Sequence, residues 1–109
     1  SKKRAESPAS SKERTLAARL RQTKRLAETG VFTNAQMTHS QVKKFCPLND
    51  ASQKFLETAI AELGFSARAY DKILKLSRTI ADLDNSDTIE TDHLAEAIQY
   101  RNLDRRGWG

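Results

Sequence analysis

The chain has 109 residues, of which 30% are charged and only 6% aromatic, a mix that favours one helical domain over a β-sandwich. Its single cysteine excludes an internal disulfide framework and a multi-cysteine zinc site. No apolar run approaches the roughly 18 residues that a membrane span needs, so we expect a soluble, cytoplasmic protein with no membrane partner.

The net charge of +5 is concentrated near the N-terminus. Residues 1–30 hold nine Lys or Arg against three Glu, whereas residues 31–109 hold ten Lys or Arg against eleven Asp or Glu. A basic segment can meet nucleic acid, an acidic protein face or an anionic membrane. It can equally be the solvated face of a helix, and charge by itself leaves these alternatives open.

The first predicted elements are a disordered polar tail over 1–10 and a helix over 11–29. Ser10 and Glu13 have the spacing of a capping box, and Gly30 can end the helix. One helical face would carry the apolar side chains and should turn inward. Its members are Leu16, Leu20, Thr23 and Ala27, with Leu26 beside them.

Four more helices are predicted, over 39–45, 50–63, 67–83 and 92–101. Their N-caps are Thr38, Asn49 or Asp50, Ser66 and Thr91, and Gly64 suits a left-handed C-terminal position. The fourth helix has the clearest buried face, formed by Tyr70, Ile73, Leu74, Ser77, Ile80 and Ala81. In the fifth helix, Leu94, Ala95 and Ile98 should face inward. We therefore expect an all-α bundle of about five helices over 11–105, with a short tail at 106–109.

Catalytic signatures are missing from the sequence. It has no glycine-rich phosphate loop, no nucleophile elbow and no zinc-protease motif, so a small-molecule enzyme has no support. His39, Cys46 and His93 lack the spacing of a metal site, and no metal is expected. Cys46 is interpreted as a small buried hydrophobe. The acidic pairs Asp82/Asp84 and Asp71/Glu62 are interpreted as solvated turns and caps.

Arg68 is unusual because it lies in the first turn of the fourth helix, where the helix dipole favours acids. It would suit a site that holds an anion at the helix start, since backbone N–H groups and a guanidinium could then point at one phosphate. The alternative is an exposed surface arginine whose stem covers a neighbour, and local physics favours that alternative.

Two segments carry a specific resemblance to a known family. They are LGFSARAYDKILKLSRTIADL at 63–83 and HLAEAIQYR at 93–101, with Asn34 and FCPL at 45–48 in support. Together they resemble the C-terminal end of the magnesium-chelatase-like AAA+ ATPases of the ComM/YifB type, over about residues 13–105. In that family a Lon-protease-like domain and an AAA+ core precede this region. The resemblance implies that the chain is the helical lid, that the Walker motifs lie upstream, and that ATP and Mg²⁺ bind in the parent protein. This chain by itself should then be no enzyme and need no cofactor.

The resemblance also implies roles for single residues. Arg68 stands where AAA+ proteins carry the sensor-2 arginine, and Arg78 and Arg101 become weaker candidates for contacts between subunits of a hexamer. DNA would be the partner of the assembled motor, in helicase or branch-migration work. The basic first helix would then line a DNA channel or pack on the AAA+ core of the same chain; its cations are Arg14, Arg19, Arg21, Lys24 and Arg25.

The competing hypothesis is an autonomous nucleic-acid-binding module that uses the basic first helix. The basic segment lacks interleaved aromatics for base stacking, and the rest of the chain is slightly acidic. Tight, steeply salt-dependent DNA binding by this chain would favour the module, and weak binding would favour the lid.

Overall fold

The computed structural model describes the backbone of residues 8–105 and the side chains of residues 11–102. Within this part of the chain there are only helices and loops, so the predicted all-α class is confirmed. The elements are α1 (Pro8–Leu26), the 3₁₀ helix η2 (Asn34–Gln36), α2 (His39–Phe45), α3 (Asp50–Leu63), α4 (Ala67–Leu83) and α5 (Thr91–Arg105). The remainder of the predicted tails, at 1–7 and 106–109, lies outside the described residues.

Local capping explains where the middle helices begin and end. The side chains of Thr38, Asn49 and Ser66 each accept a hydrogen bond from a backbone N–H in the first turn that follows. Gly64 ends α3 with φ of 68°, a left-handed conformation that glycine adopts without steric cost. Three predicted N-caps and the predicted C-terminal glycine are thereby confirmed.

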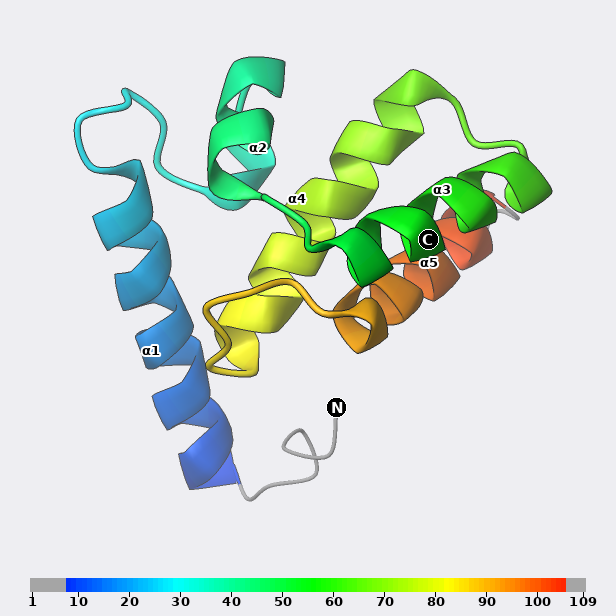
Figure 1. Ribbon diagram of the computed structural model, residues 1–109. Coiled ribbons are helices and arrows are strands. Elements are labelled where there is room, and N and C mark those ends of the chain that lie inside the picture. Colours follow the sequence, from blue (N-terminus) through cyan, green and yellow to red (C-terminus); the bar gives the residue numbers. More distant parts are fainter. Residues whose placement is uncertain (1–7, 106–109) are drawn as a thin grey trace.

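Helix α4 is the element on which the others pack. Figure 1 shows it crossing the molecule, with α1 beside its C-terminal part and α5 and α3 on the other side. The predicted apolar face of α4 is confirmed, since Ile73, Leu74, Ile80 and Ala81 are buried. The core they join also includes Leu56, Phe65, Ile89, Leu94, Ala97 and Ile98. Ala95 is exposed, contrary to expectation, and Ala97 takes the inward position in α5.

Helix α1 departs most from the sequence-based prediction. It begins at Pro8, so Ser10 lies inside the helix and cannot be its N-cap. It ends at Leu26, before Gly30, because Glu28 already has a left-handed φ of 69°. The Thr29 hydroxyl then donates to the carbonyl of Leu26 at 2.6 Å, which gives one carbonyl of the last turn a partner.

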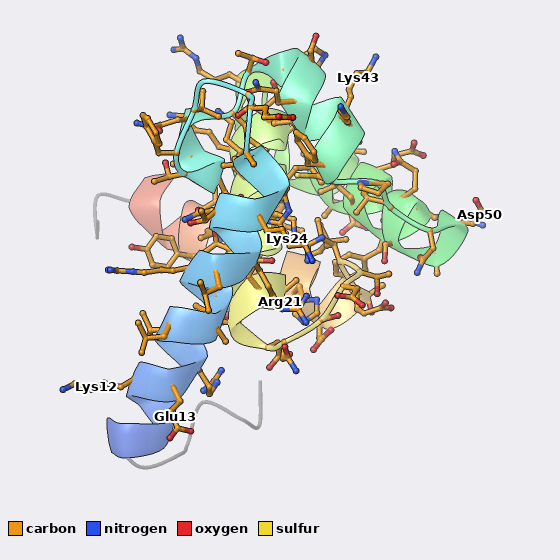
Figure 2. All side chains as sticks on the ribbon, turned by 90° about the vertical axis from the view of Figure 1, so that its left-hand side faces the viewer. Lys12, Glu13, Arg21, Lys24, Lys43 and Asp50 are labelled. Atoms are coloured by element: carbon orange, nitrogen blue, oxygen red, sulfur yellow. The ribbon has the colours of Figure 1, made fainter. Side chains whose placement is uncertain are left out.

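The orientation of α1 also differs from the prediction. Leu16 and Leu20 are 61% and 71% exposed, whereas Ala18 and Leu26 are buried. Figure 2 shows α1 on the outer side of the molecule, with Lys12, Glu13 and Lys24 projecting from it. The side that turns inward carries arginines in addition to Ala18 and Leu26, while Leu16 and Leu20 face solvent.

Candidate functional site

The start of α4 presents Arg68 to solvent. Ser66 caps the helix, and its hydroxyl accepts a hydrogen bond from the N–H of Ala69 at 3.2 Å. Arg68 is the second residue of α4, its side chain is exposed, and no acidic residue lies in this first turn. No polar contact joins its side chain to the described part of the chain. The guanidinium is therefore available for an external anion, close to backbone N–H groups that carry partial positive charge.

The same side of α4 continues with the exposed Lys72 and the half-buried Lys75, four and seven residues after Arg68. The neighbouring acid, Asp71, is already paired, because His39 Nδ1 lies 2.8 Å from its Oδ2. Lys75 donates to the carbonyl of Ala35 at 3.4 Å. The surface that begins at Arg68 is thus positive and has few competing carboxylates.

A cavity of about 260 Å³ lies between α2, α3 and α4, and its lining includes His39, Tyr70, Asp71 and Cys46. Burial raises the pKa of the Cys46 thiol to about 11, even though Arg78 and Arg25 oppose the shift. Cys46 is 4% exposed, as predicted for a small buried hydrophobe. A protonated, buried thiol is a poor nucleophile, so Cys46 is not a candidate for covalent catalysis in this cavity.

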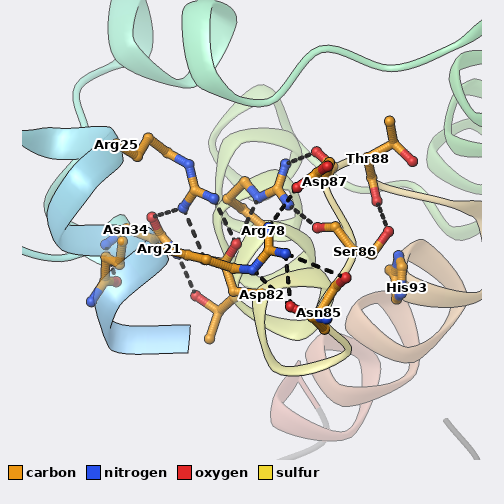
Figure 3. A network of polar contacts seen from close by, with 12 residues as sticks. Arg21, Arg25, Asn34, Arg78, Asp82, Asn85, Ser86, Asp87, Thr88 and His93 are labelled. Atoms are coloured by element: carbon orange, nitrogen blue, oxygen red, sulfur yellow. Dashed lines mark hydrogen bonds and ion pairs between the residues drawn. The ribbon is translucent and has the colours of Figure 1, made fainter. Parts of the chain in front are cut away.

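Arginines of α1 bind to the C-terminal end of α4 and to the loop after it (Figure 3). Arg25 makes a two-pronged contact with the carboxylate of Asp82, at 2.6 and 2.8 Å. Arg21 contacts Asp87 at 2.6 Å and the side-chain oxygen of Asn85 at 2.7 Å. Arg14 donates to the carbonyl of Leu83 at 3.1 Å. Five cations of α1 were expected to contact DNA or the AAA+ core. Arg14, Arg21 and Arg25 instead make contacts within the domain, while Arg19 and Lys24 are exposed.

Asp82 is the centre of this network, and the sequence-based interpretation of it as a solvated residue is wrong. It is 2% exposed and also accepts from the side-chain amide of Asn34 at 3.0 Å. Arg78, considered above for contacts between subunits, is 3% exposed, with its Nε 3.3 Å from Asp82. Because Arg78 is buried, it cannot contact another subunit. The i, i+4 spacing of Arg78 and Asp82 beside the apolar face of α4 was the one signal that could have revealed the pair.

Arg78 also fixes the loop between α4 and α5. Its guanidinium donates to the carbonyls of Ser86 and Asp87, at 2.8 and 3.1 Å. Burial lowers the pKa of Arg78, and the adjacent carboxylate of Asp82 opposes that shift. Arg101, the other residue considered for subunit contacts, is half-buried in α5.

His93 lies near two acids but acts as a structural residue. Its Nδ1 accepts from the N–H of Glu90 at 2.9 Å, and its Nε2 lies 3.0 Å from the Asp84 carboxylate. With Asp92 these groups come within 4.8 Å of one another. Both imidazole nitrogens already have partners that position the start of α5, so this cluster is explained without a metal ion.

The fold and this arrangement define a small all-α domain whose exposed arginine stands at the start of its central helix. Among residues 8–105, every helix is either too short or too polar to span a lipid bilayer.

Comparison with known proteins identifies the family. The family model for the C-terminal region of the magnesium chelatase subunit ChlI matches residues 5–101. The protein YifB of Escherichia coli is 43% identical over 100 residues, which cover 92% of this chain and 19% of that protein. The competence protein ComM of Haemophilus influenzae is 49% identical over 72 residues, covering 66% of this chain and 14% of that protein.

The chain belongs to this family: it is a magnesium chelatase C-terminal domain of the ComM/YifB type. It spans about a fifth of the length of YifB. The family resemblance expected from residues 63–83 and 93–101 is confirmed.

Proposed function

We propose that this domain is the helical lid of a longer AAA+ ATPase and that Arg68 is its sensor-2 arginine. The observation that carries the proposal is an exposed arginine as the second residue of α4, with no acid in that turn and no polar partner within the described residues. Family membership supports it, because the same position bears the sensor-2 residue in the resembling AAA+ proteins.

The residues present suit a phosphate group. Arg68 would hold the terminal phosphates of ATP, while the Walker motifs and the Mg²⁺ site would come from parts of the parent outside this chain. ATP supplies the phosphoryl group, and a fixed cation near it stabilises the negative charge that develops during transfer. Because Arg68 is part of a rigid helix, its contact with nucleotide would also tie the position of the lid to the nucleotide state.

The test is ATP turnover by the full-length parent with Arg68→Ala. We expect a loss on the order of tenfold or more with an unchanged oligomer, as removal of a positioned transition-state charge typically produces. The control is Lys72→Ala, which removes an exposed cation from the next turn of the same helix and should leave turnover near wild type. In the isolated 109-residue chain, Arg68→Ala should change the free energy of unfolding by less than about 0.5 kcal/mol. Unchanged turnover in Arg68→Ala would make Arg68 an ordinary surface residue.

We further propose that the parent assembles as a hexamer and acts on DNA, as the family resemblance implies. Branched DNA should then stimulate its ATP turnover, and turnover unaffected by DNA would count against this part of the proposal.

A further inference from the structure

Helix α1 turns arginine side chains towards the domain and two leucine side chains towards solvent. Its inward face carries Arg14, Arg21 and Arg25, each bound to the end of α4 or to the loop after it. Its outward face carries Leu16 and Leu20, which are 61% and 71% exposed. Single exposed leucines need no explanation, but two leucines one turn apart, opposite a face of half-buried arginines, form an apolar stripe.

The polar contacts fix this orientation. Rolling α1 about its axis to bury Leu16 and Leu20 would pull Arg25 away from Asp82, which is 2% exposed and already shared with Arg78. It would remove the two shortest contacts of this buried carboxylate, a loss that is costly for a charge away from water. The leucines therefore stay outward as long as the network of Figure 3 is intact.

The surroundings of the stripe indicate what could cover it. An open groove of about 730 Å³ adjoins the stripe at Leu16 and is lined by Ser11, Lys12, Thr15, Leu16 and Arg19. Lys12, Arg19 and Lys24 are exposed on α1, against the single exposed acid Glu13 within the same helix (Figure 2 labels three of these four). An apolar stripe with positive edges is complementary to an apolar surface with negative edges.

We propose that the outward face of α1 is a docking surface for an amphipathic protein helix whose leucine-type stripe is flanked by acidic residues. Helices bind in this way through anchors at i and i+4, which matches Leu16 and Leu20. A second copy of α1 fits poorly because Lys12, Arg19 and Lys24 would face the same cations. Duplex DNA fits poorly because the exposed centre is apolar and three arginines are bound within the domain. A stripe of two leucines is also short for holding a helix on a membrane. The proposal does not depend on the role of Arg68.

The probes are two synthetic amphipathic helices with the same leucine stripe, one flanked by glutamates and one by lysines. Binding to the 109-residue chain is followed by amide chemical shifts and by fluorescence anisotropy. We expect the glutamate-flanked peptide to shift amides around Leu16–Leu20 and to bind at least about tenfold more tightly than the lysine-flanked one.

Variants identify the surface. Leu16→Ser with Leu20→Ser should weaken the glutamate-flanked peptide by about tenfold or more, whereas Phe32→Ser, at a 78% exposed aromatic outside α1, should not. Lys12→Glu with Arg19→Glu should reverse the preference between the two peptides. The proposal is overturned if the leucine variant binds like wild type or if the shifts map elsewhere. It is also overturned if α1 instead binds duplex DNA or phosphatidylserine vesicles, or if the chain dimerises through this face.

Discussion

Helix α4 is joined to α5 and to α1 by contacts of opposite chemistry. Towards α5 it buries apolar side chains, with Ile73, Leu94 and Ala97 all fully buried. Towards α1 its C-terminal end offers a buried carboxylate and a carbonyl, and Arg25 and Arg14 bind them. Ala18 and Leu26 are the buried apolar side chains that α1 adds within its described residues.

This difference shows that two helices can pack on the same helix, α4, through contacts that constrain their orientation to different degrees. Apolar contact is non-directional and proportional to buried area, so the α4–α5 contact mainly supplies stability. Ion pairs and hydrogen bonds are directional, and burying their charges offsets much of their attraction. The α1–α4 contact therefore mainly fixes the rotation of α1 and adds less to stability than its number of bonds suggests.

The largest expected effect is from breaking the polar contact at its centre. Asp82→Ala leaves Arg25 and Arg78 without their buried carboxylate and should lower the free energy of unfolding by about 3–5 kcal/mol. Denaturant unfolding measures this loss, and hydrogen exchange should show the α1 amides opening first. The matched control is Asp87→Ala, which removes one partner of Arg21 at an exposed site, where solvent screens the ion pair, and should cost far less than Asp82→Ala. Equal losses from the two variants would contradict the central place of Asp82.

The second-largest expected effect is from weakening the apolar contact between α4 and α5. Leu94→Ala empties a fully buried position between α4 and α5 and should cost about 2–5 kcal/mol. Leu20→Ala removes the same atoms from the exposed stripe of α1 and should change stability by less than about 0.5 kcal/mol. Thermal and denaturant unfolding of the two variants give the comparison. If Leu20→Ala were as costly as Leu94→Ala, Leu20 would have to be buried, and the rotation of α1 described above would be wrong.

A smaller effect concerns Cys46, which lies where α2 meets α4. Its pKa is about 11 in the folded chain against an ordinary value near 9.0, because burial disfavours the thiolate. The folded state then holds the thiol proton more tightly, so this contribution is complete below about pH 9 and is lost as pH rises towards 11. The stability of the wild type should fall by at most about 1.4 kcal/mol per pH unit across that window relative to Cys46→Ala. At pH 8 the native thiol should also react with iodoacetamide far more slowly than the unfolded chain. Native and unfolded rates that agree would show that Cys46 is accessible.

Local chemistry made much of the fold predictable. The caps Thr38, Asn49 and Ser66 and the left-handed Gly64 act within one helical turn, so their effect can be identified from neighbouring residues. The buried face of α4 follows from a helical period in its own segment. The exposure of Arg68 at the start of α4 was likewise accessible from sequence, because a first-turn position and a polar side chain suffice to predict it.

The sequence by itself therefore determined the approximate positions of α1 to α5, the apolar face of α4 and the family. Only the tertiary structure decided which face of α1 turns inward. Hydrophobic periodicity predicted Leu16 and Leu20 inside, but Arg25 meets Asp82 across 57 positions of the chain. That partnership depends on where two distant helices cross, and a buried carboxylate requires its guanidinium partners more strictly than leucine requires burial.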